Sequence, residues 1–374
     1  MSADATGPER LLRRSVIGVG PYVPGAGARE LKARTGRTDL IRLNWNENLL
    51  GPLDGVLDAV AASLPDAWMY PEETDEEFRD AVAAWAGAGP AQVIPGHGIQ
   101  ALTLSLVAAF IEPGDRVVIP RPTYGLYTSV CAVAGAEVIR VETDPDTLAF
   151  DLYELARVAN EVSAKLVFVC DPNNPTGLRA RRRDWDAFLQ ALPDRCLAVA
   201  DEAYADYIEP GERIDRLADI DAGRPVVVLR TFSKIFGLAG LRLGYMLVHE
   251  SLAAHLDAVQ EPFNVNCAAL AAGLASLDRV DQLPTRRAQA AAARERLVTP
   301  LTAAGIRCLT SHASFVLVQV GGDDVGVCEA LAREGLLLRA GREFGLPGYV
   351  RVTIGPEALM DRVADALVAA VGGR

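Results

Sequence analysis

The feature of this sequence that most limits its fold is an alternation of short apolar runs with longer helical patterns, between about residues 68 and 249. Such alternation is typical of a parallel β-sheet covered by helices, because each pair of parallel strands needs a long crossover connection. Runs rich in Val, Ile and Leu predict strands at residues 92–95, 116–120, 137–141, 166–170, 197–200, 226–230 and 244–248. Helical patterns lie between them at residues 98–111, 124–134, 152–160 and 183–191. We therefore expect an α/β fold with a seven-stranded, mostly parallel sheet between helices.

The pattern changes after Pro262. A long alanine-rich helical stretch at residues 267–304 is followed by apolar runs and one further helical pattern, at residues 307–309, 314–320, 326–334 and 350–354. This mixture predicts a smaller α+β domain at residues 263–374, after a large domain at residues 51–262. Residues 1–50 contain the turn-rich segment PYVPGAG, and we expect them to pack over the smaller domain or over the cleft.

Composition narrows the classes of function. The chain has 374 residues and a net charge of -12, and an acidic surface of this kind repels nucleic acid and anionic membranes. No apolar run reaches the ~18 residues of a transmembrane helix, and the first twenty residues lack a signal-peptide core. The six cysteines form no CxxC pair and the four histidines do not cluster, so we expect no metal site. A cytoplasmic enzyme with small-molecule substrates is the resulting expectation.

Polar residues follow three of the predicted strands. LVFVC is followed by DPNNPTG, LAVA by DEAY, and VVVLR by TFSKIFGLAGLR. Ligands of an open α/β sheet bind beyond the carboxyl ends of the strands. If these strands are parallel neighbours, residues of the three segments meet at one edge of the sheet, namely Asn174, Asp201, Tyr204 and Lys234.

These four residues match the needs of pyridoxal 5'-phosphate (PLP), an aromatic aldehyde cofactor. Lys234 supplies an amine for a Schiff base with the aldehyde. A buried Asp201 keeps the pyridine nitrogen protonated, so that the ring can accept electrons from a carbanion. Asn174 and Tyr204 can donate hydrogen bonds to the phenolic oxygen of the ring. We therefore predict that Lys234, Asp201 and Tyr204 are catalytic residues and that Asn174 binds the cofactor.

The chain also offers a place for the phosphate of this cofactor. Gly96, His97 and Gly98 turn from a predicted strand into a helix, where free backbone amides and the helix dipole attract an anion. Arg242 can reach the same anion with a bidentate guanidinium. Further side chains expected beside the ring or the phosphate are Tyr124, Thr231 and Ser233.

Motifs spread over residues 21–355 resemble those of one enzyme family. They are PYVPG, NWNEN, MYPE, PGHG, PTYGLY, DPNNPTG, DEAY, TFSKIFGLAGLRLGY, PFNVN, LLLR and VRVTIG. In this order they resemble class I/II PLP-dependent aminotransferases of fold type I, and the histidinol-phosphate aminotransferases in particular. The resemblance implies a ping-pong exchange of the amino group of an L-amino acid or amino-alcohol phosphate with a 2-oxo acid. Lys234 then acts as general base at the substrate Cα.

The resemblance also implies roles that the residue pattern leaves unassigned. Arg351 matches the family's arginine for the substrate carboxylate, and Arg339 matches an arginine that meets a distal anion of the substrate. Tyr22 and Asn46 match residues near the substrate. Tyr70 matches a tyrosine that reaches across a dimer interface to the cofactor phosphate of the partner. The resemblance therefore implies a homodimer with shared active sites.

One segment departs from the family's pattern and leaves the substrate open. The family usually has GNGSDE where this chain has GHGIQA, so the side-chain hydroxyl expected at position 99 is missing. The backbone amide of Ile99 can still bind phosphate. Histidinol phosphate and aromatic, basic or other amino acids all remain candidate donors. Two other functions also remain. One is a different reaction at Cα on the same fold, namely decarboxylation, elimination, cyclisation or oxidation, and the other is a non-catalytic binding protein.

Overall fold

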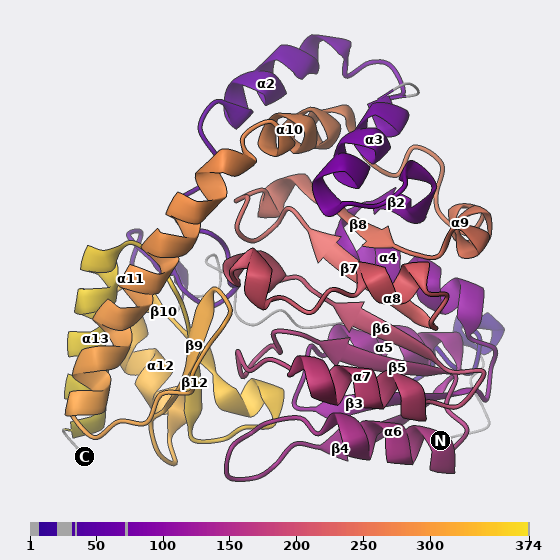
Figure 1. The fold of residues 1–374 in the computed structure, drawn as a ribbon. Helices are drawn as coiled ribbons and strands as arrows, with labels where there is room; N and C mark the ends of the chain where they lie inside the picture. Colours follow the sequence, from indigo (N-terminus) through magenta and orange to yellow (C-terminus); the bar gives the residue numbers. More distant parts are fainter. Residues whose placement is uncertain (1–6, 21–31, 34–35, 72–73, 373–374) are drawn as a thin grey trace.

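The computed structural model describes residues 7–20, 32–33, 36–71 and 74–372. Within these residues the largest sheet has seven strands, in the order β2-β8-β7-β6-β5-β3-β4 (Figure 1). They are β2 (Val93–Gly96), β3 (Arg116–Arg121), β4 (Glu137–Glu142), β5 (Leu166–Cys170), β6 (Leu197–Asp201), β7 (Val226–Thr231) and β8 (Gly244–Leu247). Strand β8 pairs antiparallel with both of its neighbours, and the other pairs are parallel. The prediction of a seven-stranded, mostly parallel sheet is confirmed.

Helices cover both faces of this sheet. One face packs against α4 (Gly98–Phe110), α5 (Leu126–Ala134) and α9 (Glu250–Asp257). The other packs against a larger set, namely α2 (Val56–Ser63), α3 (Thr74–Ala86), α6 (Leu152–Glu161), α7 (Arg182–Ala191), α8 (Leu217–Asp221) and α10 (Cys267–Leu277). Side chains alternate between the faces along each strand, so Val117 and Ile119 enter one core and Val118 enters the other.

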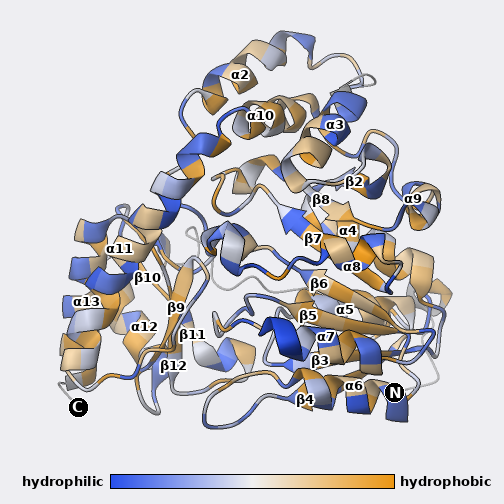
Figure 2. Cartoon of the chain, in the orientation of Figure 1, coloured by the Kyte–Doolittle hydropathy of each residue, from blue (hydrophilic) through white to orange (hydrophobic). Residues whose placement is uncertain are grey.

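The apolar residues gather on the strands of the central sheet, as Figure 2 shows. Strand β5 is fully buried along its length, which explains why it appears in the sequence as an unbroken apolar run. No helix in the described ranges is both long enough and apolar enough to cross a membrane.

A second unit follows the large sheet in the chain. Its described part contains a three-stranded antiparallel sheet of β11 (Arg339–Ala340), β12 (Tyr349–Thr353) and β9 (Phe315–Gln319). Three helices pack with it around a separate apolar core, and they are α11 (Leu283–Ala303), α12 (Asp324–Arg333) and α13 (Glu357–Gly372). In Figure 1 this unit lies beside the large sheet, with α11 running along α13.

The structure adds two details to this part of the chain. The stretch at residues 267–304 is two helices, α10 and α11, separated by a 3-10 turn at Val280–Gln282. Helix α10 packs on the large-sheet side and α11 packs in the smaller core, so the chain must turn between them. Alanine favours helix without marking a buried face, and the sequence pattern therefore concealed this break. Residues 307–309 form a single antiparallel bridge, Cys308 with Val318, and no strand.

The described residues before Gly51 contact both units. Strand β1 (Ile41–Arg42) pairs in parallel with β10 (Leu336–Leu337) of the smaller unit. Nearer the N-terminus, Arg13 and Ser15 donate hydrogen bonds to carbonyl oxygens at the end of α5, at 3.3 and 2.8 Å. These two residues therefore lie on the large unit, whereas we expected the segment over the smaller domain or the cleft. The domain limits at residues 50 and 262 stay predictions.

Candidate active site

A cavity of about 500 Å³ lies beyond the carboxyl ends of β5, β6 and β7. Its opposite wall comes from β11, β12 and the residues that follow β1, so it lies between the two sheets. Most of the predicted site residues line it, namely Asn46, Ile99, Tyr124, Asn174, Asp201, Tyr204, Thr231, Ser233, Lys234, Arg242, Arg339 and Arg351. The expected meeting of three strand ends at one edge is thus present in the structure.

Lys234 lies in the turn after β7 and is partly buried. Its Nζ donates a hydrogen bond to the carbonyl oxygen of Asn46 at 3.2 Å and lies 5.4 Å from the centre of the Tyr204 ring. Burial lowers the pKa of Lys234 to about 8, and the cations of Arg351 and Arg242 act in the same direction. A substantial fraction of this amine is therefore neutral near pH 8, as a nucleophile requires.

Asp201 is the last residue of β6 and is only 2% exposed. Its Oδ2 accepts a hydrogen bond from the Tyr127 hydroxyl at 2.5 Å, and its Oδ1 accepts one from the Ala203 amide at 3.0 Å. Burial raises the pKa of Asp201 to about 6, against the opposing effect of these hydrogen bonds and of Lys234. A buried carboxylate of this kind gains most from a cationic partner in the cavity, such as a protonated ring nitrogen.

Asn174 and Tyr204 are held by residues from the opposite wall. Arg351, which is 2% exposed, donates hydrogen bonds to Asn174 Oδ1 at 2.5 Å and to the Asn44 carbonyl at 2.7 Å. Because this oxygen already accepts, the amide of Asn174 is oriented to donate through its nitrogen. Asn46 Nδ2 donates to the Tyr204 hydroxyl at 3.0 Å. Burial raises the pKa of Tyr204, so its hydroxyl is neutral and can donate.

The start of α4 has the features of an anion site. Gly98 has a φ of +74°, and a Cβ at this position would lie 2.9 Å from Nη2 of Arg242. Glycine therefore lets the guanidinium lie in its present position against the N-terminus of this helix. The Thr231 hydroxyl donates to the Ser233 hydroxyl at 2.9 Å, beside the same end of the cavity. A cation, two hydroxyls and a helix N-terminus together suit a phosphate group.

Other predicted residues lie elsewhere. The side chain of His97 is exposed and is not part of the cavity wall, and Gly96 and Gly98 shape the turn through their backbone. Tyr70 is 72% exposed outside the cavity, where its ring stacks on Phe263 with 4.5 Å between centroids. Tyr22 lies outside the described residues.

Sequence reasoning missed Tyr127, which supports the cavity from behind Asp201 without lining it, and several residues that do line the cavity. Tyr127 holds Asp201 and stacks on Phe168 with 4.6 Å between centroids, while its pKa is raised by burial. The signal was its place in PTYGLY, three residues after Tyr124. The missed residues that line the cavity are Trp45 and Glu47 of the NWNEN motif, together with Arg42, Gln100 and Cys170. No group of three or more His, Cys, Asp or Glu side chains suited to a metal occurs among the described residues.

Comparison with known proteins identifies the family. The model of the aminotransferase class I and II family matches residues 38–367 of this chain. The chain belongs to this family. The histidinol-phosphate aminotransferase of Symbiobacterium thermophilum is 37% identical to this aminotransferase over 361 residues, which cover 96% of this chain and 99% of the relative. The enzyme of the same name from Moorella thermoacetica is 35% identical over 92% of this chain and 88% of its own.

Solved structures agree with this assignment. The histidinol-phosphate aminotransferase of Sinorhizobium meliloti, solved in complex with PLP, superimposes with a TM-score of 0.87 at 29% identity, covering 96% of this chain and 97% of that one. The aspartate aminotransferase of Thermus thermophilus with maleate has a TM-score of 0.84 at 23% identity, covering 96% and 99%, and shows the shared fold. The predictions of fold type I, of a PLP-dependent transaminase and of PLP as cofactor are confirmed.

The residues of the cavity fit PLP. The aldehyde of this cofactor is matched by a lysine with a lowered pKa, and the ring nitrogen by a buried carboxylate. The phenolic oxygen is matched by two neutral donors, and the phosphate by a cationic helix N-terminus. The chemistry of each group therefore has a counterpart in the wall.

Proposed function

We propose that this aminotransferase takes the amino group of an amino-alcohol phosphate, with histidinol phosphate as the leading candidate, and passes it to a 2-oxo acid. The observation that carries the proposal is a second cavity of about 360 Å³, which shares Tyr124, Asn174 and Arg339 with the first. The names of the two curated relatives described above support the same substrate.

Arg339 lies where the two cavities meet. It is 8% exposed, pairs with Glu343 at 3.1 Å and packs over the Phe344 ring at 4.5 Å. The second cavity is also lined by Thr128, Ser129 and Arg140. A phosphate needs more room and more donors than a carboxylate, and its charge favours a bidentate guanidinium. The arginine, the hydroxyls and the space beyond them therefore suit a phosphate on the donor.

The proposed roles of the other residues follow from their contacts. Bound PLP supplies an aldehyde carbon for the substrate amine and a ring that stores the electron pair released at Cα. Asp201 holds the proton on the ring nitrogen, and Tyr204 and Asn174 donate to the phenolic oxygen. Arg351, from β12, binds the carboxylate of the 2-oxo acid, because an amino-alcohol phosphate has no anion besides its phosphate. The neutral Nζ of Lys234 removes the proton from Cα of the donor, and in the second half of the exchange the protonated Nζ delivers a proton to Cα of the new amino acid.

We also propose that the enzyme is a homodimer with shared active sites. Large apolar side chains are exposed close together, with Tyr70 72% and Phe263 51% exposed and stacked on each other. Trp68 and Met69 precede Tyr70 directly and are 81% and 47% exposed. We call these four residues the aromatic patch. Contiguous apolar patches of this kind are typical of protein interfaces, which supports a contact with a second copy and the predicted reach of Tyr70.

A cytoplasmic location is the remaining proposal. All six cysteines lie in described parts of the chain and are free thiols. Burial raises the pKa of several of them, for example Cys131 and Cys196, to about 12. Proteins of reducing compartments keep thiols in this form, which supports the location.

A donor screen with 2-oxoglutarate as acceptor tests the substrate. Histidinol phosphate should give the highest kcat/KM, well above histidinol and phenylalanine. An Arg339→Met variant should lose roughly 10–100-fold in kcat/KM for the phosphorylated donor, because a charge-assisted contact to the phosphate is lost. The control is Arg116→Met, which removes a surface ion pair with Glu137 and should change little. Equal rates with histidinol and histidinol phosphate would contradict the proposal, as would release of carbon dioxide or ammonia in place of an oxo product.

A further inference from the structure

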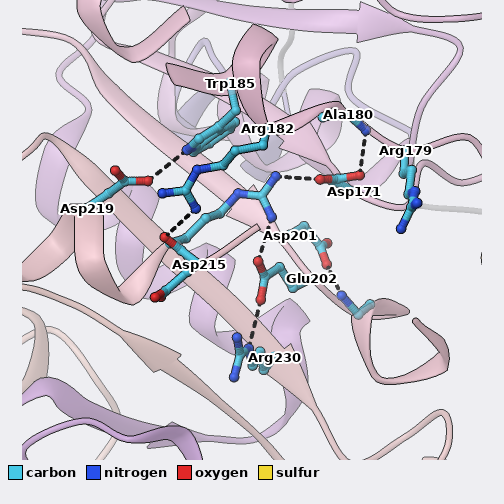
Figure 3. A network of polar contacts seen from close by, with 12 residues as sticks. Asp171, Arg179, Ala180, Arg182, Trp185, Asp201, Glu202, Asp215, Asp219 and Arg230 are labelled. Atoms are coloured by element: carbon cyan, nitrogen blue, oxygen red, sulfur yellow. Dashed lines mark hydrogen bonds and ion pairs between the residues drawn. The ribbon is translucent and has the colours of Figure 1, made fainter. Parts of the chain in front are cut away.

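A buried network of charged side chains joins the ends of β5, β6 and β7 (Figure 3). Asp171 directly follows β5, Glu202 directly follows β6, and Arg230 is the next-to-last residue of β7. Asp171 and Glu202 are 4% and 3% exposed. Three adjacent parallel strands thus carry a charged residue at the same end.

Arg216, from the segment before α8, joins these strand ends. Its Nη2 donates to Asp171 Oδ2, and its Nη1 donates to Glu202 Oε1 at 2.6 Å. The other carboxylate oxygen of Glu202 accepts from Arg230 Nε at 2.8 Å. Arg216 is 2% exposed and its guanidinium lies 4.1 Å from the centre of the Trp185 ring. The network is balanced, with two acidic and two basic side chains.

Each strand end in this network continues into a residue of the cofactor site. Asp171 precedes Asn174 by three residues, Glu202 is adjacent to Asp201, and Arg230 precedes Lys234 by four. Asp171 also constrains the loop that carries Asn174, because its Oδ1 accepts from the Ala180 amide at 2.9 Å on the far side of that loop. The network therefore connects three chain segments, each of which also carries a residue that lines the cavity.

We propose that Arg216 is a positioning residue, which sets the relative placement of Asn174, Asp201 and Lys234 by holding Asp171 and Glu202. This inference rests on the roles proposed above for those three residues. Buried ion pairs add little net stability, because desolvation of the charges offsets their attraction, whereas removal of one partner is disruptive. An arrangement of this kind is better suited to fixing geometry than to stabilising the fold. None of the four network residues lines the cavity, so their effect on the site is indirect.

The charge state of the network supports this reading. Burial by itself raises the pKa of Glu202. The cations of Arg230 and Arg216 outweigh this effect and bring the pKa below its ordinary value. Glu202 therefore stays ionised beside Asp201. A neutral side chain at position 202 would leave Arg216 and Arg230 competing for weaker acceptors and would free the end of β6 to shift.

The test uses the holoenzyme and two conservative variants, Glu202→Gln and Arg216→Lys. The control is Asp324→Asn, which neutralises a buried carboxylate paired at 2.7 Å with the half-exposed Arg342 in the smaller unit. Three quantities are measured for each protein. They are the melting temperature, the dissociation constant for PLP, and the pH at which the visible absorbance band of lysine-bound PLP is half converted.

We expect Glu202→Gln to raise the PLP dissociation constant about tenfold or more, by analogy with losses of 10–100-fold when groups that orient ligand-binding side chains are removed at metal sites. The pH midpoint should move as well. The PLP dissociation constant and the pH midpoint of Arg216→Lys should lie between those of Glu202→Gln and the wild type. A lysine keeps the positive charge but cannot donate to both carboxylates as the guanidinium does. Asp324→Asn should lower the melting temperature without moving either cofactor property.

A network with a purely structural role would behave differently. Variants that melt at a lower temperature and yet keep the wild-type PLP affinity and pH midpoint would overturn the proposal. If Arg216→Lys does not fold, Glu202→Gln decides the question, since it keeps the shape of the side chain. Absence of a lysine-bound cofactor in the wild-type protein itself would refute the proposed role of Lys234, and with it this inference.

Discussion

Lys234 and Asp201 illustrate how burial prepares single residues for the roles that we propose for them. Burial lowers the pKa of the lysine from 10.5 to about 8 and raises that of the aspartate from 3.8 to about 6. In both cases the charged form is disfavoured by a poorly hydrated environment. A bound cofactor with an aldehyde and a protonated ring nitrogen relieves both penalties, since it consumes the neutral amine and pairs with the carboxylate.

The lowered pKa of Lys234 predicts how cofactor attachment depends on pH. Only the neutral amine attacks the aldehyde. Because this amine loses its proton around pH 8, the rate at which cofactor-free protein binds PLP covalently should rise up to about pH 8 and then level off. Stopped-flow absorbance after mixing with PLP measures this rate. A lysine with its ordinary pKa of 10.5 would give a rate that still climbs at pH 10, and that result would contradict the prediction.

The start of α4 shows how an element presents a binding site. The helix begins at a residue with positive φ, and Arg242 lies against it from the segment before β8, itself with a φ of 60°. Both backbone conformations are unfavourable for residues other than glycine. Arg242 adopts this strained conformation beside a helix N-terminus that has no acidic residue in its first turn, which leaves that end free for an external anion.

A Gly98→Ala variant separates backbone strain from loss of the site. The added methyl group meets Arg242 Nη2 at 2.9 Å and forces the guanidinium away from the helix N-terminus. We expect a loss of stability of about 1–2 kcal/mol from the positive φ, together with a PLP affinity lowered at least about tenfold through loss of a charged contact. The control is Gly114→Ala, at φ +95° in open space, which should lose stability alone. Fluorescence titration with PLP and thermal melting distinguish the two effects. Unchanged PLP affinity in Gly98→Ala would argue against a phosphate at this helix.

On the scale of the whole molecule, the cavity is made by two packed units. The large sheet supplies Asp201 and Lys234, and the smaller unit supplies Arg339 and Arg351 across the gap. Asn46, which follows β1, connects them, since its backbone amide donates to the Thr353 hydroxyl at 3.0 Å and its side chain donates to Tyr204. A change in the packing of the units therefore changes both walls of the cavity, because Arg351 and Asn46 also hold Asn174 and Tyr204.

The aromatic patch makes a prediction about assembly. If it lies in a dimer interface, Trp68→Glu places a charge in that interface and should raise the dimer dissociation constant by at least about a hundredfold, since unpaired buried charges cost several kcal/mol. Sedimentation equilibrium measures this change, and wild type should have about twice the mass of one chain. Tyr153→Glu is the control, because Tyr153 is similarly exposed at 75% on α6 and lies outside the patch. A monomeric wild-type enzyme with full activity would refute the shared site.

Much of this architecture could be predicted from the sequence, because the signals are local. A strand buried on both faces must be an apolar run, and ligand-binding residues of a parallel sheet follow such runs directly. The seven strands of the large sheet were therefore located to within a residue at each end, and Asn174, Asp201 and Lys234 were found beside them. The substrate roles proposed for Arg339, Arg351 and Asn46 came from family resemblance, since nothing near them in the chain shows what they face.

The remaining features depend on contacts between distant segments. Tyr127 and Asp201 are 74 residues apart, Arg351 and Asn174 are 177 apart, and Arg216 reaches Asp171 from 45 residues away. No pattern in the sequence shows which of these distant residues contact each other. The break between α10 and α11 has the same origin, because two separate cores require the chain to turn where alanine-rich sequence alone favours one continuous helix. Burial of the side chains, which sets the pKa values of Lys234 and Asp201, likewise exists only once the two units have packed together.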